Sequence, residues 1–168
     1  MALIVETGAG VASAESFTTD AEFVAYAAKF GVTLPALESD RDILQRKAIK
    51  LILQYESRNS FKGLKVDPLN QNLPYPRKYV YIHCELLASN VIPHQLKTAQ
   101  LEAGLIANTG QSLITDETVQ DLKVGKLNNM EAEFHKGGAY STKTFSSVRN
   151  ALSDLFKSNS GFGHNERV

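Results

Sequence analysis

The sequence has few of the residues that staple small proteins or build metal sites. Its single cysteine, Cys84, excludes an intramolecular disulfide and a zinc site made of cysteines. It has no tryptophan, and its net charge is zero because 18 Lys and Arg residues balance 18 Asp and Glu residues. A dedicated duplex-DNA binder would carry a strong basic excess, so the balance argues against that class. No apolar run approaches the roughly 18 residues of a membrane span, and we expect no membrane partner.

Hydrophobic spacing predicts a mainly α fold, a small bundle of about four helices with one β-hairpin and extended N- and C-terminal arms. The clearest start signal is the capping box of Thr19 and Glu22. The predicted helices are a first one after Thr19 that ends at Gly31, a second over about 40–57 with Ser39 as N-cap, a third from Pro93 to Gly110, and a last one over about 146–157. The second is apolar on two faces, so we expect it in the middle of the bundle.

The chain divides into three predicted parts. These are an extended N-terminal arm over residues 1–17, a helical domain over 18–157, and a flexible C-terminal tail over 158–168. A hairpin is expected near 122–134, because Asn128 and Asn129 fit a two-residue turn. The resulting register pairs Leu127 with Met130 and Lys126 with Glu131. Residues 79–82 fit either a short strand or a turn of helix.

Two short motifs suggest chemistry, but a structural interpretation fits each of them better. Gly8 and Gly10 follow an apolar run as in a dinucleotide-binding loop, yet no third small residue opens a helix there, which favours a flexible arm. His83 and Cys84 suggest a base and a nucleophile, but adjacent side chains point apart in strands and helices. We therefore expect Cys84 to be a partly buried structural thiol.

The other histidines and a cluster of carboxylates give no stronger signal. His94, His135 and His164 lack the spacing of metal ligands. Asp116, Glu117 and Asp121 fit a solvated helix start or loop better than a magnesium or acid-base site. With no convergent acid, base and nucleophile, we expect no enzymatic activity, no cofactor and no metal.

Charge is unevenly distributed although it sums to zero. Residues 1–40 carry six acidic residues and one basic residue, whereas residues 41–78 carry nine basic and three acidic residues. Arg46 and Lys50 lie on one face of the second predicted helix, with Lys47 beside them. These three residues form a candidate basic face.

The basic face has two interpretations. It contacts nucleic acid, with Tyr75, Tyr79 and Tyr81 as stacking groups, or it meets the acidic block of an identical neighbour head to tail. The zero net charge favours the contact between neighbours.

Short motifs follow one another along nearly the whole chain. They include Leu3-Ile4-Val5-Glu6, Ala14-Glu15-Ser16-Phe17, Gly31-Val32-Thr33-Leu34-Pro35, Phe61-Lys62-Gly63, Leu73-Pro74-Tyr75-Pro76-Arg77, Val91-Ile92-Pro93, Lys123-Val124-Gly125 and Glu131-Ala132-Glu133-Phe134. Their order and spacing resemble tailed-phage head-tail connector (adaptor) proteins. Relatives are often labelled DnaT-like single-stranded-DNA-binding proteins, and many carry Trp where this chain has Tyr75.

The resemblance implies a virion structural protein that forms a ring of twelve copies between the portal and the tail. Its implied partners are the portal protein, other copies of the chain, the next connector or tail protein, and the packaged DNA in the lumen. It implies a location at the head-tail interface of the virion, and in the host cytoplasm during assembly. The tail residues Gly161, Phe162, Gly163 and Arg167 would dock on the portal. The alternative function is a single-stranded-DNA-binding protein of the replication type.

Overall fold

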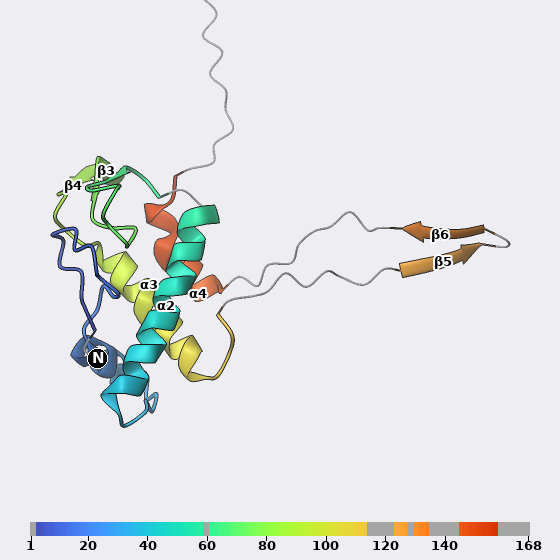
Figure 1. Ribbon diagram of the computed structural model, residues 1–168, viewed down its shortest axis with the longest axis horizontal. Helices are drawn as coiled ribbons and strands as arrows, with labels where there is room; N and C mark the ends of the chain where they lie inside the picture. Colours follow the sequence, from blue (N-terminus) through green and yellow to red (C-terminus); the bar gives the residue numbers. More distant parts are fainter. Residues whose placement is uncertain (1–2, 59–60, 114–122, 128–129, 135–144, 158–168) are drawn as a thin grey trace, which may run out of the picture.

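The computed structural model describes residues 3–58, 61–113, 123–127, 130–134 and 145–157 of the chain. Its helices are α1 (Asp20–Lys29), α2 (Glu38–Arg58), α3 (His94–Asn108) and α4 (Ser146–Leu152), with a short 3-10 helix, η1 (Ser153–Leu155), after α4. Figure 1 shows α2, α3 and α4 side by side at the centre of the bundle, where α3 contacts both of the others. The predicted mainly α bundle of four helices is confirmed.

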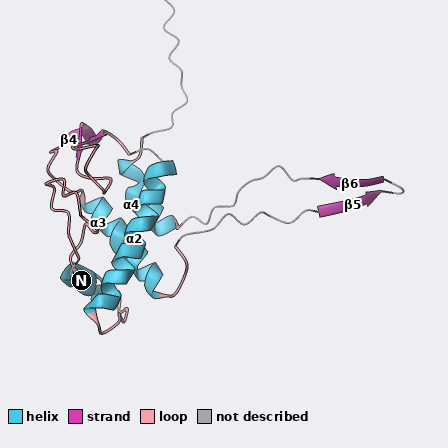
Figure 2. Cartoon of the chain, in the orientation of Figure 1, coloured by secondary structure: helices cyan, strands magenta, loops and turns pink. Residues whose placement is uncertain are grey.

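Short strands form three antiparallel pairs within the described residues. β1 (Leu64–Lys65) pairs with β2 (Arg77–Lys78), β3 (Val80–Ile82) with β4 (Glu85–Leu87), and β5 (Lys123–Leu127) with β6 (Met130–Phe134). The predicted hairpin and its register are confirmed, since Leu127 pairs with Met130 and Lys126 with Glu131. Figure 2 places the β3–β4 hairpin and its loops at one end of the bundle and α1 at the other.

The capping box predicted for α1 is present. The Thr19 hydroxyl accepts from the Glu22 amide at 3.1 Å, and the Thr19 amide donates to the Glu22 carboxylate at 2.8 Å. Phe23 and Ala27 of the predicted stripe are buried, and Gly31, with a φ of 65°, follows the end of the helix. Local chemistry therefore sets both ends of this helix.

The buried stripe of α2 agrees with the prediction, whereas the predicted N-cap does not. Leu44, Ala48, Leu51 and Tyr55 are all buried, which places the helix at the centre of the core. Ser39 lies inside the first turn, because the helix begins at Glu38 and the Arg41 amide already donates to the Leu37 carbonyl. The acidic residues of that first turn favour the positive end of the helix dipole.

Small residues on α3 allow α1 to approach closely. Ala99, Ala103 and Ala107 are buried along one stripe, as predicted. Gly104 lies against the ring of Phe23, and a Cβ added there would be 2.8 Å from the Phe23 Cε2 atom. The helix packing at this point therefore requires a residue without a side chain.

The last predicted helix is shorter than expected. α4 ends at Leu152 and continues as η1 to Leu155, after which Phe156 takes an extended conformation. Phe156 pairs with Phe61 in an isolated antiparallel bridge, and the two rings stack with centroids 5.1 Å apart. This contact between distant parts of the chain ends the helix before residue 157.

The N-terminal segment contains no helix, as predicted, but it packs against the bundle instead of leaving it. Ala14 and Phe17 are buried, which the expectation of an arm with little to pack did not foresee. The segment folds back on itself, because the Glu6 amide donates to the Ser16 carbonyl and the Glu15 amide to the Ile4 carbonyl, both at 2.8 Å.

Among the described helices, none is both long enough and apolar enough to cross a bilayer.

Candidate nucleic-acid interface

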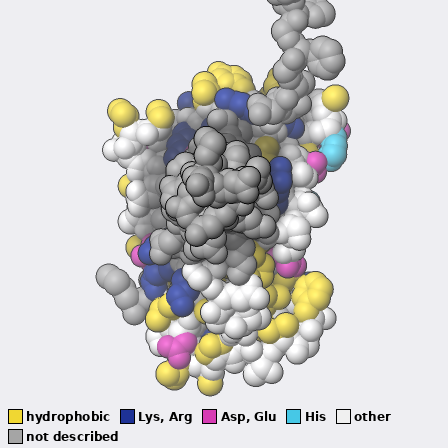
Figure 3. All heavy atoms as spheres, turned by 90° about the vertical axis from the view of Figure 1, so that its right-hand side faces the viewer, with side chains coloured by type: hydrophobic (Ala, Val, Ile, Leu, Met, Phe, Trp, Pro, Cys, Tyr) yellow, Lys and Arg dark blue, Asp and Glu magenta, His cyan; other side chains and the backbone are white. Residues whose placement is uncertain are grey.

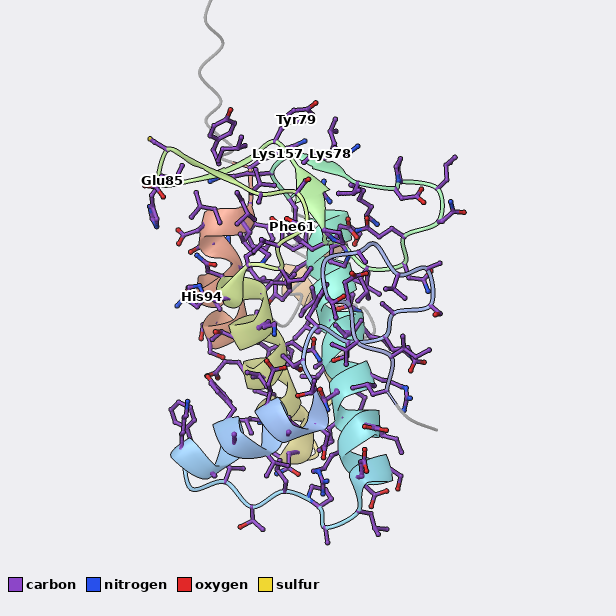
Figure 4. All side chains as sticks on the ribbon, turned by 90° about the vertical axis from the view of Figure 1, so that its left-hand side faces the viewer. Phe61, Lys78, Tyr79, Glu85, His94 and Lys157 are labelled. Carbon is purple, nitrogen blue, oxygen red and sulfur yellow. The ribbon has the colours of Figure 1, made fainter. Side chains whose placement is uncertain are left out.

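Two exposed tyrosines and two lysines share a shallow hollow at the β3–β4 end of the bundle. Tyr79 and Tyr81 are 68% and 54% exposed, and they line the hollow together with Lys62 and Lys157. We call these four residues the tyrosine–lysine surface. Figure 4 shows Tyr79 and Lys157 at this end, with Lys78 near them. The arrangement offers aromatic faces and positive charge at one place.

The two tyrosines face outward from different backbone conformations. Val80 is fully buried, and Tyr81, the next residue of β3, lies on the opposite, exposed side. Tyr79 precedes β3 with a φ of 59° and is exposed as well. The Lys62 ammonium donates to the Tyr81 carbonyl at 3.3 Å, which holds the loop before β1 against β3. Gly63 permits this approach, because a Cβ there would lie 2.2 Å from the Lys78 carbonyl oxygen.

The lysines come from two Phe-Lys dipeptides that the fold brings together. Phe61 and Phe156 form the antiparallel bridge, and Lys62 and Lys157 follow them in the chain. Neither lysine is among the site residues predicted from the sequence. The repeated dipeptide could have drawn attention to them, but only the tertiary contact shows that they meet.

Arg77 anchors the surface from below and is not available to a ligand. Its side chain is nearly buried, and its guanidinium donates to the carbonyls of Lys62 at 2.9 Å, Gly63 at 3.0 Å and Pro74 at 3.2 Å. It also pairs with the Glu56 carboxylate at 3.2 Å. One basic residue of the 41–78 block therefore fixes the loop that carries Lys62 to the end of α2.

Tyr75 cannot act as the stacking group that the sequence suggested. It is 0% exposed and lies edge-on to Phe61, with ring centroids 5.7 Å apart. Burial raises the pKa of its hydroxyl well above the usual range. Of the three predicted stacking tyrosines, the structure leaves Tyr79 and Tyr81 on the surface.

The acidic and basic blocks meet inside one chain. Asp20 pairs with Arg41 at 2.6 Å, and Glu15 with Arg46 at 2.9 Å. The hydrogen bond from Arg46 lowers the pKa of the Glu15 carboxyl. Of the basic face predicted to meet a neighbouring copy, Arg46 is therefore already paired within the chain.

The three residues of the candidate basic face therefore differ in what they contact. Arg46 is held by Glu15, whereas Lys47 and Lys50 are exposed and form no ion pair or hydrogen bond within the described part of the chain. Figure 3 shows Lys and Arg side chains at the upper end of the right-hand face of the molecule and again lower down.

His83 and Cys84 form the two-residue turn between β3 and β4. Both have positive φ, 50° and 69°, as a type I′ hairpin turn requires. That conformation directs both side chains outward, so the expectation of a partly buried thiol is wrong. The His83 Nε2 atom lies 3.6 Å from the Asp154 carboxylate, so the imidazole has a neighbour other than Cys84.

The glycines near the N-terminus form a cradle for a carboxylate of the same chain. The buried Glu6 accepts from the amides of Gly8 at 2.8 Å, Gly10 at 3.0 Å and Val11 at 2.6 Å. Gly8 lies so close to the backbone that a Cβ would be 1.9 Å from the Asn90 carbonyl oxygen. The Glu6 carboxylate of the same chain therefore occupies the amides that a dinucleotide loop would offer to a phosphate.

No group of three or more metal-binding side chains occurs among the residues that the structure describes, where His94 is exposed at the start of α3. Several predicted site residues lie outside the described residues: His135, His164, Asp116, Glu117, Asp121, Gly161, Phe162, Gly163 and Arg167.

Comparison with known proteins gives one match over the whole chain. The family model described as "Putative DnaT-like ssDNA binding protein" matches residues 1–168. No curated protein and no solved structure matches the chain. The family match overturns the expectation of a virion head-tail connector with a portal protein, a ring of copies and a tail protein as partners, because its description names a different function.

Proposed function

The chain belongs to this DnaT-like family, and from that membership we propose that it binds single-stranded DNA through the tyrosine–lysine surface without a catalytic step. The observation that carries the proposal is the exposure of Tyr79 and Tyr81 in one hollow with Lys62 and Lys157.

Exposed tyrosines and lysines have separate tasks in such a surface. Each unpaired base presents a flat face on which an aromatic ring stacks, with a gain of about 1–3 kcal/mol per base and little preference for sequence. Lys62 and Lys157 add positive charge that attracts the phosphates, and this part of the affinity decreases with salt. In a duplex the base faces are already stacked, so the tyrosines favour single strands.

Zero net charge is compatible with this function because the basic charge that matters is local. Three arginines already bind carboxylates or carbonyls of the same chain: Arg41, Arg46 and Arg77. The lysines of the tyrosine–lysine surface have no carboxylate partner among the described residues, so their charge is available at the hollow.

A binding titration with alanine variants tests the proposal. We expect Tyr79→Ala and Tyr81→Ala each to weaken binding to a fluorescent oligothymidine by about 1–3 kcal/mol. Phe30→Ala is the matched control, because Phe30 is 61% exposed but lies beyond the end of α1, away from the hollow. Undetectable binding by the unmodified protein at low salt, or an equal loss in the control, would contradict the proposal.

A further inference from the structure

Beyond its first turn, helix α2 presents an exposed stripe that contains two lysines and no acidic residue. Its members recur at helical spacing and are exposed or half-buried: Ile43, Lys47, Lys50, Gln54 and Ser57. The stripe runs toward the end of α2 at Arg58, and Lys62 of the tyrosine–lysine surface follows a few residues later. The C-terminal end of α2 lies at the same end of the bundle as strands β3 and β4 (Figure 1), so the stripe runs toward the proposed DNA site.

The acidic residues of α2 lie away from the two lysines, although Asp40 shares the face of the stripe about two turns before Lys47. Asp42 is 3% exposed and belongs to the core, whereas Glu56 is held by Arg77 and Lys65. Glu38 and Asp40 lie in the first turn, at the far end of the helix from Arg58. No carboxylate therefore neutralises Lys47 or Lys50 within the described residues.

Lys47 and Lys50 line a hollow between α2 and the end of α3. The opposite wall includes Ala107, Gly110 and Gln111, where a φ of 79° at Gly110 turns the chain away from the helix. Two unpaired ammonium groups at the edge of a hollow concentrate positive potential there. The ligand chemistry that suits them is a phosphate group.

We propose that Lys47 and Lys50 form a second phosphate-contact site for the same DNA strand, which follows the exposed stripe of α2 from the tyrosine–lysine surface to this hollow. The inference rests on the proposed function and adds a path and a length to it. Lys50 and Arg58 are about 12 Å apart along the helix axis, at about 1.5 Å per residue. A bound strand must therefore extend at least this far beyond the end of α2 to reach Lys50.

Salt titrations with two lengths of oligothymidine test the path in the full-length protein. An oligonucleotide of about 3 nucleotides is too short to span both sites and covers only the tyrosine–lysine surface, whereas one of about 20 nucleotides reaches both sites. For single strands the slope of log K against log salt is about −0.7 per phosphate contact, so losing two contacts makes the slope shallower by about 1.4. We expect the double variant Lys47→Ala, Lys50→Ala to show this change with the long oligonucleotide and no change with the short one.

Lys29→Ala is the matched control, because Lys29 is exposed in the last turn of α1. It should leave the slope unchanged with both oligonucleotides. An unchanged slope in the double variant with the long oligonucleotide would refute the second site, and so would an equal change with the short one. If the unmodified protein binds neither oligonucleotide, the proposed function is wrong, and the second phosphate-contact site is then refuted as well.

Discussion

Tyr75 places a polar group where the surroundings are apolar. Its side chain is fully buried between Pro74 and Pro76, and its hydroxyl has no hydrogen-bond partner among the described residues. A buried polar group without a partner costs about 1–3 kcal/mol, because water satisfies it in the unfolded chain. The ring fills the core against Phe61, whereas the hydroxyl adds nothing that the structure shows.

Removing that hydroxyl should therefore stabilise the protein. We expect Tyr75→Phe to raise the free energy of unfolding by about 1–3 kcal/mol in urea denaturation. Tyr55→Phe is the control, since the Tyr55 hydroxyl accepts from the Phe145 amide at 3.2 Å, and its loss should lower the free energy of unfolding by about 1 kcal/mol. A destabilised Tyr75→Phe protein would show that the hydroxyl has a partner.

At the level of single residues, the sequence identified the tyrosines but not their environments. Tyr79 and Tyr81 are both predicted stacking groups, but only Tyr81 belongs to β3, whereas Tyr79 precedes the strand with a φ of 59°. Which face is exposed depends on Val80 meeting the core, and that is a tertiary property. The same applies to Cys84, whose exposure follows from the positive φ of a turn that the apolar pattern does not specify.

Among the elements, the contact of α1 with α3 depends on one missing side chain. A Cβ atom added to Gly104 would lie 2.8 Å from the Phe23 ring. Phe23 is fully buried, so its ring cannot move aside into solvent. Alanine at this position gains about 1 kcal/mol of helix propensity, but overpacking a tight core typically costs about 1–3 kcal/mol. The cost of overpacking exceeds the gain in helix propensity because the Phe23 ring is enclosed by the core.

We therefore expect Gly104→Ala to lower the free energy of unfolding by about 1 kcal/mol, measured in urea. In a Phe23→Leu background the smaller side chain leaves room for the added methyl group. The same Gly104→Ala substitution should there be neutral or stabilising, which a double-mutant cycle detects as coupling between the two sites. Equal effects in both backgrounds would mean that the Phe23 contact is not what requires glycine.

Elements with local start and stop signals were predicted well, and elements that end on distant contacts were not. The capping box of α1 and the register of the β5–β6 hairpin follow from neighbouring residues. In contrast, α4 stops early because Phe156 pairs with Phe61, and residues 3–17 pack because Phe17 enters the core. No pattern within those segments predicts that Phe156 contacts Phe61 or that Phe17 is buried.

On the scale of the whole molecule, the fold pairs part of the uneven charge within the chain. Asp20, Glu15 and Glu22 of the acidic block pair with Arg41, Arg46 and Lys97. The two charge blocks read from the sequence therefore do not describe two opposed surfaces. The sequence does not show which lysines lack an ion-pair partner, because the partners come from residues far apart in the chain.

The molecule should distinguish single strands from duplexes more by its tyrosines than by its charge. In competition measured by fluorescence anisotropy, we expect an oligonucleotide to bind about tenfold more tightly as a single strand than as a duplex, the equivalent of stacking about one base. The double variant Tyr79→Ala, Tyr81→Ala should lose most of this preference while its weak, salt-sensitive duplex binding is unchanged. A preference that survives the double variant would place the discrimination elsewhere on the protein.

The β3–β4 turn also makes the protein easy to observe. Cys84 is the only cysteine of the chain, is exposed, and lines the same hollow as the two tyrosines. A maleimide fluorophore will therefore attach at one position, beside the proposed DNA site, without any engineered residue. The natural sequence thus supplies an optical reporter for strand arrival, and its emission can be followed in stopped-flow experiments on unmutated protein.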